Sequence, residues 1–165
     1  MKTLYLIRHA KSSWKQPGLS DHERPLNKRG ESDAPLMADI LKKNKIFPDL
    51  ILSSDAVRAA EFAKIIADVL PYKKKNIQFT NDLYLANENE MLKIVREIDD
   101  EIETAFLVSH NPGITYFANL LCNHNTDNIP TSGIFGINFD VKSWKEIKFG
   151  IGKFLLFEYP KKYYP

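Results

Sequence analysis

Apolar positions along the chain follow two different patterns. Short unbroken apolar runs occupy residues 3–7, 48–53 and 104–109. Their length and their content of β-branched, aromatic and leucine side chains predict buried strands. Between these runs, apolar residues recur every three or four positions, which predicts amphipathic helices. The alternation of the two patterns indicates an α/β fold with a largely parallel sheet.

Polar residues mark where the predicted helices begin. Asn27 is placed to cap a helix that ends at Asn44, and Pro35 predicts either a kink in it or a start just before that residue. A second helix follows Ser54 or Asp55 and reaches about residue 70. A third begins after residue 87 or 89 and runs to about residue 98, and a fourth has Pro112 in its first turn and reaches about residue 122.

The remaining segments complete the predicted architecture. Residues 77–80 indicate a short strand, and residues 131–159 contain two strand-like runs joined by a hairpin connection at 141–150. We therefore predict a three-layer sandwich, with a mostly parallel central sheet, an antiparallel edge strand and helices on both faces. The length of 165 residues fits a single domain over residues 1–165.

Composition narrows the classes of protein to consider. The formal net charge of +2 argues against a dedicated nucleic-acid binder. No apolar stretch is long enough for a membrane span, and the single cysteine, Cys122, excludes an internal disulfide. We expect a cytoplasmic monomer with no nucleic-acid or membrane partner.

Three of the predicted strands end in residues suited to phosphoryl chemistry. Arg8 and His9 follow the first strand, Arg58 lies one turn into the helix after the second, and His110 follows the third. The carboxyl ends of parallel strands meet at one edge of a sheet, so these four side chains should share a pocket. A neutral imidazole can attack phosphorus, while guanidinium groups bind its oxygens and neutralise charge.

Neither a metal nor a cofactor is expected at this site. The chain has no cluster of His, Cys and carboxylate residues at metal-ligand spacing, and it has no glycine-rich phosphate loop of the Walker type. The sequence thus predicts metal-independent chemistry.

These motifs, taken in order, resemble those of the histidine phosphatase (phosphoglycerate mutase-like) superfamily. Arg8-His9-Ala10 is similar to its Arg-His-Gly signature, and the segments around Arg58 and His110 match its other two core motifs. Residues 21–30, DHERPLNKRG, resemble the small branch typified by the phosphohistidine phosphatase SixA. The resemblance covers residues 4 to about 121.

The resemblance implies a role for each matching residue. His9 would be the nucleophile that becomes phosphorylated, and Arg8, Arg58 and His110 would form the phosphate pocket. Arg24 would reach in from the loop at residues 11–26 to contact phosphate or substrate; the alternative is a local pair with Asp21 or Glu23.

The general acid has two interpretations. Larger family members use a carboxylate, for which Glu88 is the candidate here. The alternative, which the sequence favours, is that Glu88 is an acidic residue that stabilises a helix N-terminus. Imidazole is a good leaving group, so an enzyme acting on phosphohistidine could work without a dedicated acid.

We therefore predict a metal-independent phosphatase with a phosphohistidine enzyme intermediate. By resemblance, its substrate is a protein carrying phosphohistidine, such as a histidine phosphotransfer domain. Two alternatives remain open: a phosphatase for a small phosphomonoester, and a non-catalytic phosphate-binding module.

Overall fold

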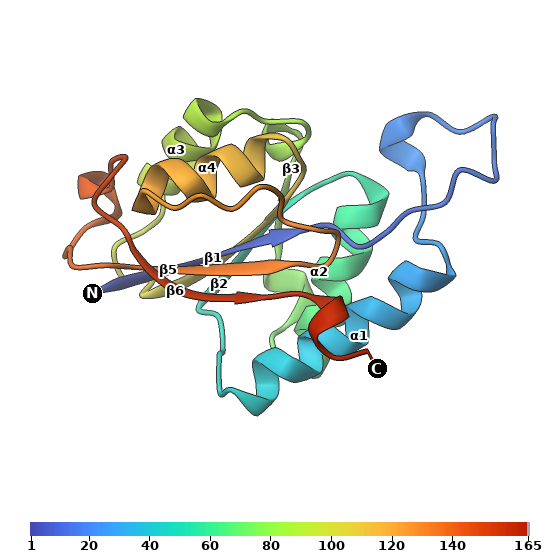
Figure 1. Cartoon of the computed structure of the whole chain (residues 1–165), viewed down its shortest axis with the longest axis horizontal. Coiled ribbons are helices and arrows are strands. Elements are labelled where there is room, and N and C mark those ends of the chain that lie inside the picture. Colours follow the sequence, from blue (N-terminus) through green and yellow to red (C-terminus); the bar gives the residue numbers. More distant parts are fainter. Residues whose placement is uncertain (165) are drawn as a thin grey trace.

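The computed structural model describes residues 1–164, and at its centre is a six-stranded sheet (Figure 1). The strand order is β3-β2-β4-β1-β5-β6, in which β1 to β4 are parallel and β5 is antiparallel to both of its neighbours. This confirms the predicted mostly parallel α/β sheet with an antiparallel end. The strands are β1 (Lys2–Arg8), β2 (Leu50–Ser54), β3 (Gln78–Thr80), β4 (Thr104–Ser109), β5 (Ile134–Phe139) and β6 (Lys153–Glu158).

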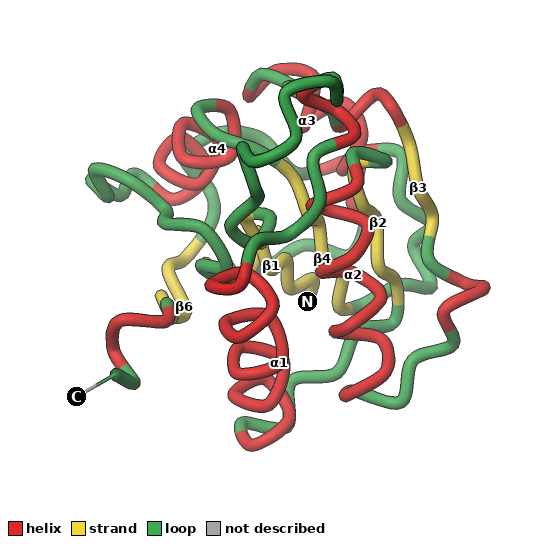
Figure 2. The backbone as a smooth tube through the Cα atoms, turned by 90° about the vertical axis from the view of Figure 1, so that its right-hand side faces the viewer, coloured by secondary structure: helices red, strands yellow, loops and turns green. Residues whose placement is uncertain are grey.

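Two helices cover each face of the sheet. Side chains alternate along β1, so that Leu4 and Leu6 join one hydrophobic core and Tyr5 and Ile7 join the other. The first core is closed by α3 (Glu88–Arg96) and α4 (Gly113–Cys122), and the second by α1 (Lys28–Lys43) and α2 (Val57–Val69). Figure 2 shows α1 and α2 side by side, on the opposite side of the strands from α3 and α4. None of the described helices is long and apolar enough to cross a membrane.

Helix boundaries follow the predicted caps in two cases. The Asn27 side chain accepts a hydrogen bond from the Gly30 amide, and Asn87 forms a reciprocal capping box with Glu90. A helix start just before Pro35 was wrong, because α1 starts at Lys28 and continues through that residue, and a kink there stays a prediction. Pro35 and Glu31 are both exposed, so water can reach the Glu31 carbonyl that loses its helical partner.

The start of α2 also differs from the prediction. Its N-cap is Ala56, and neither Ser54 nor Asp55 holds that position. Ser54 is the last residue of β2, where it pairs with Thr80 of β3, and its hydroxyl lies beside His110 instead. Five short 3-10 helices, which the hydrophobic pattern did not predict, also occur among residues 1–164.

The register of the sheet determines where the functional side chains emerge. Arg8 at the end of β1 pairs directly with Ser109 at the end of β4, and Ser53 of β2 pairs with Val108. The three strand ends named in the sequence are therefore neighbours at one edge of the sheet. His9, Ser54 and His110 lie at this edge because each ends or directly follows one of these strands.

Candidate active site

Arg8, His9, Arg58 and His110 lie together at the carboxyl edge of the parallel strands. The ring centroids of His9 and His110 are 4.9 Å apart, and the charges of Arg8 and Arg58 act on both rings. Arg8, His9 and Arg58 line a cavity of about 370 Å³, together with Arg24. We call this cavity the phosphate pocket. Its other lining residues are Lys11, Ser12, Ser13, Trp14, Lys15, Asn27 and Thr131.

His9 has a defined tautomer. Its Nδ1 lies 2.8 Å from the carbonyl oxygen of Ala10, and because a carbonyl only accepts, Nδ1 must carry the hydrogen. Burial, with smaller contributions from the charges of Arg58, Arg8 and Arg24, outweighs the opposing effect of the Ala10 hydrogen bond and lowers the pKa of His9 to about 3. The ring is thus neutral at physiological pH and keeps a free lone pair on Nε2.

We infer that Ser54 holds His110 in the opposite tautomer. The Ser54 oxygen accepts a hydrogen bond from the Ala56 amide at 3.1 Å and lies 2.8 Å from Nε2 of His110. Among the described residues, that nitrogen is the one acceptor next to the buried Ser54 hydroxyl, and we assign the hydroxyl as its donor. Nδ1 of His110 then carries a hydrogen, and no partner satisfies it in residues 1–164. Burial, with the nearby His9 next in importance, lowers the pKa of His110 to about 2.

The two arginines also present unused donors. Arg8 Nη1 donates to the Ile129 carbonyl at 3.0 Å, while Arg58 donates from Nη1 and Nη2 to the Asp21 carbonyl and carboxylate at 2.7 and 3.0 Å. The Nε atoms of both arginines are buried and lack a partner in the part of the chain described. The positive charges of Arg8 and Arg58, together with that of Arg24, indicate a site for an anion in the phosphate pocket.

Asp21 is a site residue that the sequence analysis did not assign. Its carboxylate accepts hydrogen bonds from Arg58, from Arg24 at 3.0 Å and from the Tyr84 hydroxyl at 2.6 Å. These contacts, with that of Tyr84 the strongest, hold the pKa of Asp21 well below its usual range. The i,i+3 spacing indicated the pair with Arg24, but no local pattern indicated Arg58 or Tyr84. Asp21 therefore acts as a counter-ion that orients two guanidinium groups.

The position of Arg24 fits both a local ion pair and a contact with substrate. It pairs with Asp21, and it also lines the phosphate pocket, where its guanidinium carbon lies 3.4 Å from the centroid of the Trp14 ring. Trp14 is 77% exposed and stands at the mouth of the pocket. A contact of Arg24 with substrate remains a prediction.

Glu88 is not joined to this cluster by any contact among residues 1–164. It is the first residue of α3, within the turn that the Asn87–Glu90 capping box closes. The residue of the same chain region that does reach the cluster is Tyr84, whose ring lies 5.4 Å from that of His110. A general acid role for Glu88 is still only a prediction.

The described residues contain no group of three or more His, Cys, Asp and Glu side chains placed to hold a metal ion. The positive charge available to an anion in the phosphate pocket comes from its lining cations, Arg8, Lys11, Lys15, Arg24 and Arg58.

Comparison with known proteins points to one family. Residues 4–84 match the model of the histidine phosphatase superfamily, branch 1. An uncharacterized protein of Mycobacterium leprae is 30% identical over 94% of this chain and 100% of its own length. An uncharacterized chloroplastic protein of Arabidopsis thaliana is 37% identical over 73% of this chain, and the match spans 59% of that longer protein.

The fold has a similar counterpart among solved structures. The protein histidine phosphatase SixA, solved in complex with tungstate, has a TM-score of 0.82 and 23% identity, covering 97% of this chain and 98% of SixA. This likeness shows the fold alone, while the family model and the matched motifs establish that the chain belongs to the histidine phosphatase superfamily, branch 1.

Proposed function

We propose that this protein is a metal-independent phosphatase that removes the phosphoryl group from phosphohistidine on a protein, through a phosphohistidine formed at His9. One observation carries the proposal: a neutral His9 with a free Nε2 lone pair lines the same cavity as the cations Arg8, Arg24 and Arg58. A nucleophile beside cations that can bind phosphoryl oxygens is the arrangement that phosphoryl transfer requires.

The reaction would proceed in two steps. Nε2 of His9 attacks phosphorus, the bond between phosphorus and the substrate nitrogen breaks, and the substrate imidazole departs and takes a proton. Water then attacks the phosphorylated His9, restoring the neutral ring and releasing inorganic phosphate. In both steps Arg8, Arg58 and Nδ1–H of His110 would bind the phosphoryl oxygens, where negative charge is concentrated.

Three features favour phosphohistidine as the substrate. The chain resembles the small SixA branch at residues 21–30, and its fold superposes on SixA over nearly its full length. SixA was solved with tungstate, an oxyanion of the kind that the phosphate pocket would accept. No carboxylic acid contacts the His9–His110 pair among residues 1–164, and an imidazole leaving group needs none.

Trapping the intermediate tests this proposal. After brief incubation with a ³²P-labelled phosphohistidine protein and rapid quenching, we expect label on the enzyme that is stable to base and released by acid. His9→Ala should abolish both label and turnover while leaving the protein folded, because a residue at a strand end that faces a pocket contributes little to core packing. Arg58→Ala should lower turnover by roughly 10²-fold or more, since it removes a stabiliser of developing charge.

Each alternative predicts a different result. A non-catalytic binding module would bind phosphate but show no turnover with any substrate, including 4-nitrophenyl phosphate. Near-normal turnover by His9→Ala would remove His9 from the nucleophile role. Turnover of small phosphomonoesters without turnover of phosphohistidine would favour the small-molecule phosphatase.

A further inference from the structure

A second cavity adjoins the phosphate pocket. It has a volume of about 520 Å³ and shares two lining residues, Lys11 and Thr131, with the phosphate pocket. We call it the side groove. We propose that the side groove holds an acidic segment of the substrate protein, next to the phosphohistidine in the phosphate pocket; this inference rests on the function proposed above.

Backbone hydrogen bonds fix the segment between the two cavities to Arg8 and His9. The Ser132 amide lies within hydrogen-bonding distance of the carbonyl oxygens of Arg8 and His9, at 3.2 and 3.0 Å, and the Arg8 amide donates to Gly133 at 3.0 Å. Thr131, which borders both cavities, directly precedes this anchored segment. The side groove therefore has a fixed position relative to His9, as a subsite for the rest of a substrate requires.

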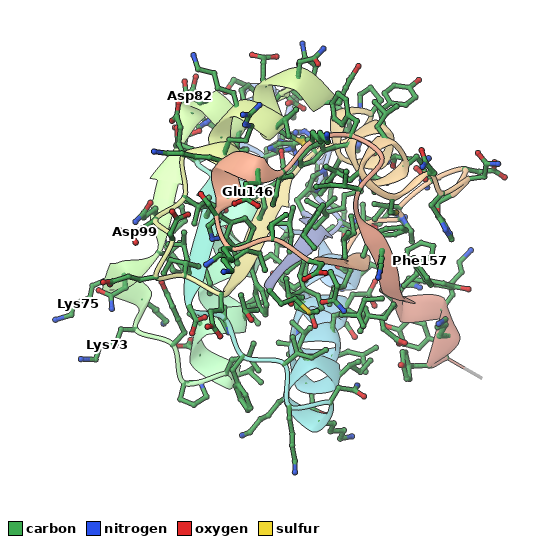
Figure 3. The ribbon with its side chains drawn as sticks, turned by 90° about the vertical axis from the view of Figure 1, so that its left-hand side faces the viewer. Lys73, Lys75, Asp82, Asp99, Glu146 and Phe157 are labelled. Atoms are coloured by element: carbon green, nitrogen blue, oxygen red, sulfur yellow. The ribbon has the colours of Figure 1, made fainter. Side chains whose placement is uncertain are left out.

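The far wall of the side groove is aromatic and supported by the core. Phe157 and Tyr159 line it, with ring centroids 5.1 Å apart, and Phe157 also packs at 5.6 Å against buried Phe135. Figure 3 shows Phe157 on β6, close to the short helix that follows this strand. Half-buried aromatic rings of this kind offer a rigid surface against which peptide side chains can pack.

The charge of the side groove is positive. It is lined by Lys11, Arg29 and Lys161 and by a single carboxylate, Asp33. Asp33 is buried, pairs with Arg29 at 3.1 Å and accepts a hydrogen bond from the Tyr164 hydroxyl, so its charge is already neutralised. Lys11 and Lys161 make no ion pair within residues 1–164, and these two cations can therefore attract an acidic segment.

The side groove has room for a part of the substrate beyond the phosphorylated imidazole. A cavity of about 520 Å³ falls in the range that accommodates a drug-sized ligand, well beyond one phosphorylated imidazole. Because the phosphoryl group and its imidazole would occupy the phosphate pocket, the side groove would take residues that flank the phosphohistidine.

Two phosphohistidine peptides of equal length, flanked by three aspartates or by three asparagines, test this inference. We expect the wild-type protein at low salt to hydrolyse the aspartate peptide with a kcat/KM about five- to tenfold higher. Lys161→Glu should abolish this preference. Lys73→Glu is the matched control, because it changes the net charge equally on an exposed residue near the opposite edge of the sheet (Figure 3), and it should retain the preference.

The possible results separate this inference from the proposed function. Equal hydrolysis of both peptides by the wild type would overturn the side-groove assignment and leave the phosphatase proposal intact. A preference that survives Lys161→Glu, or that Lys73→Glu also removes, would overturn it as well, since long-range charge would then be the cause. Hydrolysis of 4-nitrophenyl phosphate but of neither peptide would overturn the phosphohistidine substrate and the side-groove inference with it.

Discussion

At the scale of single residues, the chemistry of the site depends on which ring nitrogen of each histidine carries hydrogen. The Ala10 carbonyl and the Ser54 hydroxyl give His9 and His110 opposite tautomers. The two rings, whose centroids are 4.9 Å apart, thus differ in the nitrogen that carries hydrogen, and His9 lines the phosphate pocket. Ser54 is a positioning residue in this arrangement, because it acts through His110.

Replacing Ser54 tests this assignment. Ser54→Ala should lower kcat by roughly tenfold or more, because His110 is no longer confined to the tautomer that donates from Nδ1. Nitrogen-15 NMR of the imidazole should show Nδ1 of His110 protonated in the wild type and a mixture of tautomers in the variant. Ser54→Thr, which keeps the hydroxyl, should restore both properties.

Ser53→Ala provides the control, since the Ser53 hydroxyl donates to the Ser54 carbonyl and contacts neither histidine. Its kcat should stay close to that of the wild type. A wild-type spectrum with the hydrogen of His110 on Nε2 would contradict the assigned role of Ser54.

At the scale of elements, the sequence predicted those features of the fold that depend on residues close together in the chain. The Asn27 and Asn87 caps, the strand ends and the convergence of His9 with His110 all follow from periodicity and from the geometry of parallel strands. Asp21 and Tyr84 could not be assigned in the same way, because their partners are distant in sequence and meet only after folding. The cap of α2 was wrong for a related reason: pairing with β3 extends β2 through Ser54.

Glu88 acts at the level of a helix, because an acidic side chain at the start of α3 interacts favourably with the helix dipole. Glu88→Gln should lower the free energy of unfolding by about 0.3–1 kcal/mol, through the loss of a favourable interaction with the helix dipole. The variant should hydrolyse phosphohistidine and aryl phosphates as fast as the wild type, because neither leaving group needs an acid.

Alkyl phosphates provide the decisive comparison for Glu88. General acid catalysis is typically worth about 10²–10⁴-fold, so without an acid the wild type should cleave them far more slowly than aryl phosphates. Equal rates for both in the wild type, with selective loss of alkyl hydrolysis in Glu88→Gln, would identify Glu88 as the acid and favour a small phosphomonoester as the substrate.

At the scale of the whole molecule, the two buried histidines make the free energy of unfolding depend on pH. The pKa values of His9 and His110 fall from 6.5 in the unfolded chain to about 3 and about 2 in the folded protein. Between pH 6.5 and 5 the unfolded chain therefore binds more protons, and the free energy of unfolding falls as the pH falls. At pH 5 each histidine should contribute a slope of about 1.3 kcal/mol per pH unit, and at pH 6.5, where the unfolded imidazole is half protonated, about half of that.

Denaturant unfolding in phosphate-free buffer at several pH values between 6.5 and 5 measures this slope. In His9→Ala the slope should be roughly half that of the wild type, because one of the two linked protons is removed. Identical slopes in the two proteins would mean that His9 titrates alike in the folded and unfolded chains.

The unpartnered donors of Arg8, Arg58 and His110 have a consequence for selectivity. On the proposed function, these three residues bind the oxygens of a phosphoryl group, and free phosphate carries the same oxygens. Inorganic phosphate would therefore satisfy these donors as well as the substrate does, so the product inhibits the enzyme by occupying its site. Discrimination between a phosphoprotein and free phosphate must then come from the surfaces around the pocket, such as Trp14 at its mouth and Lys161 in the side groove.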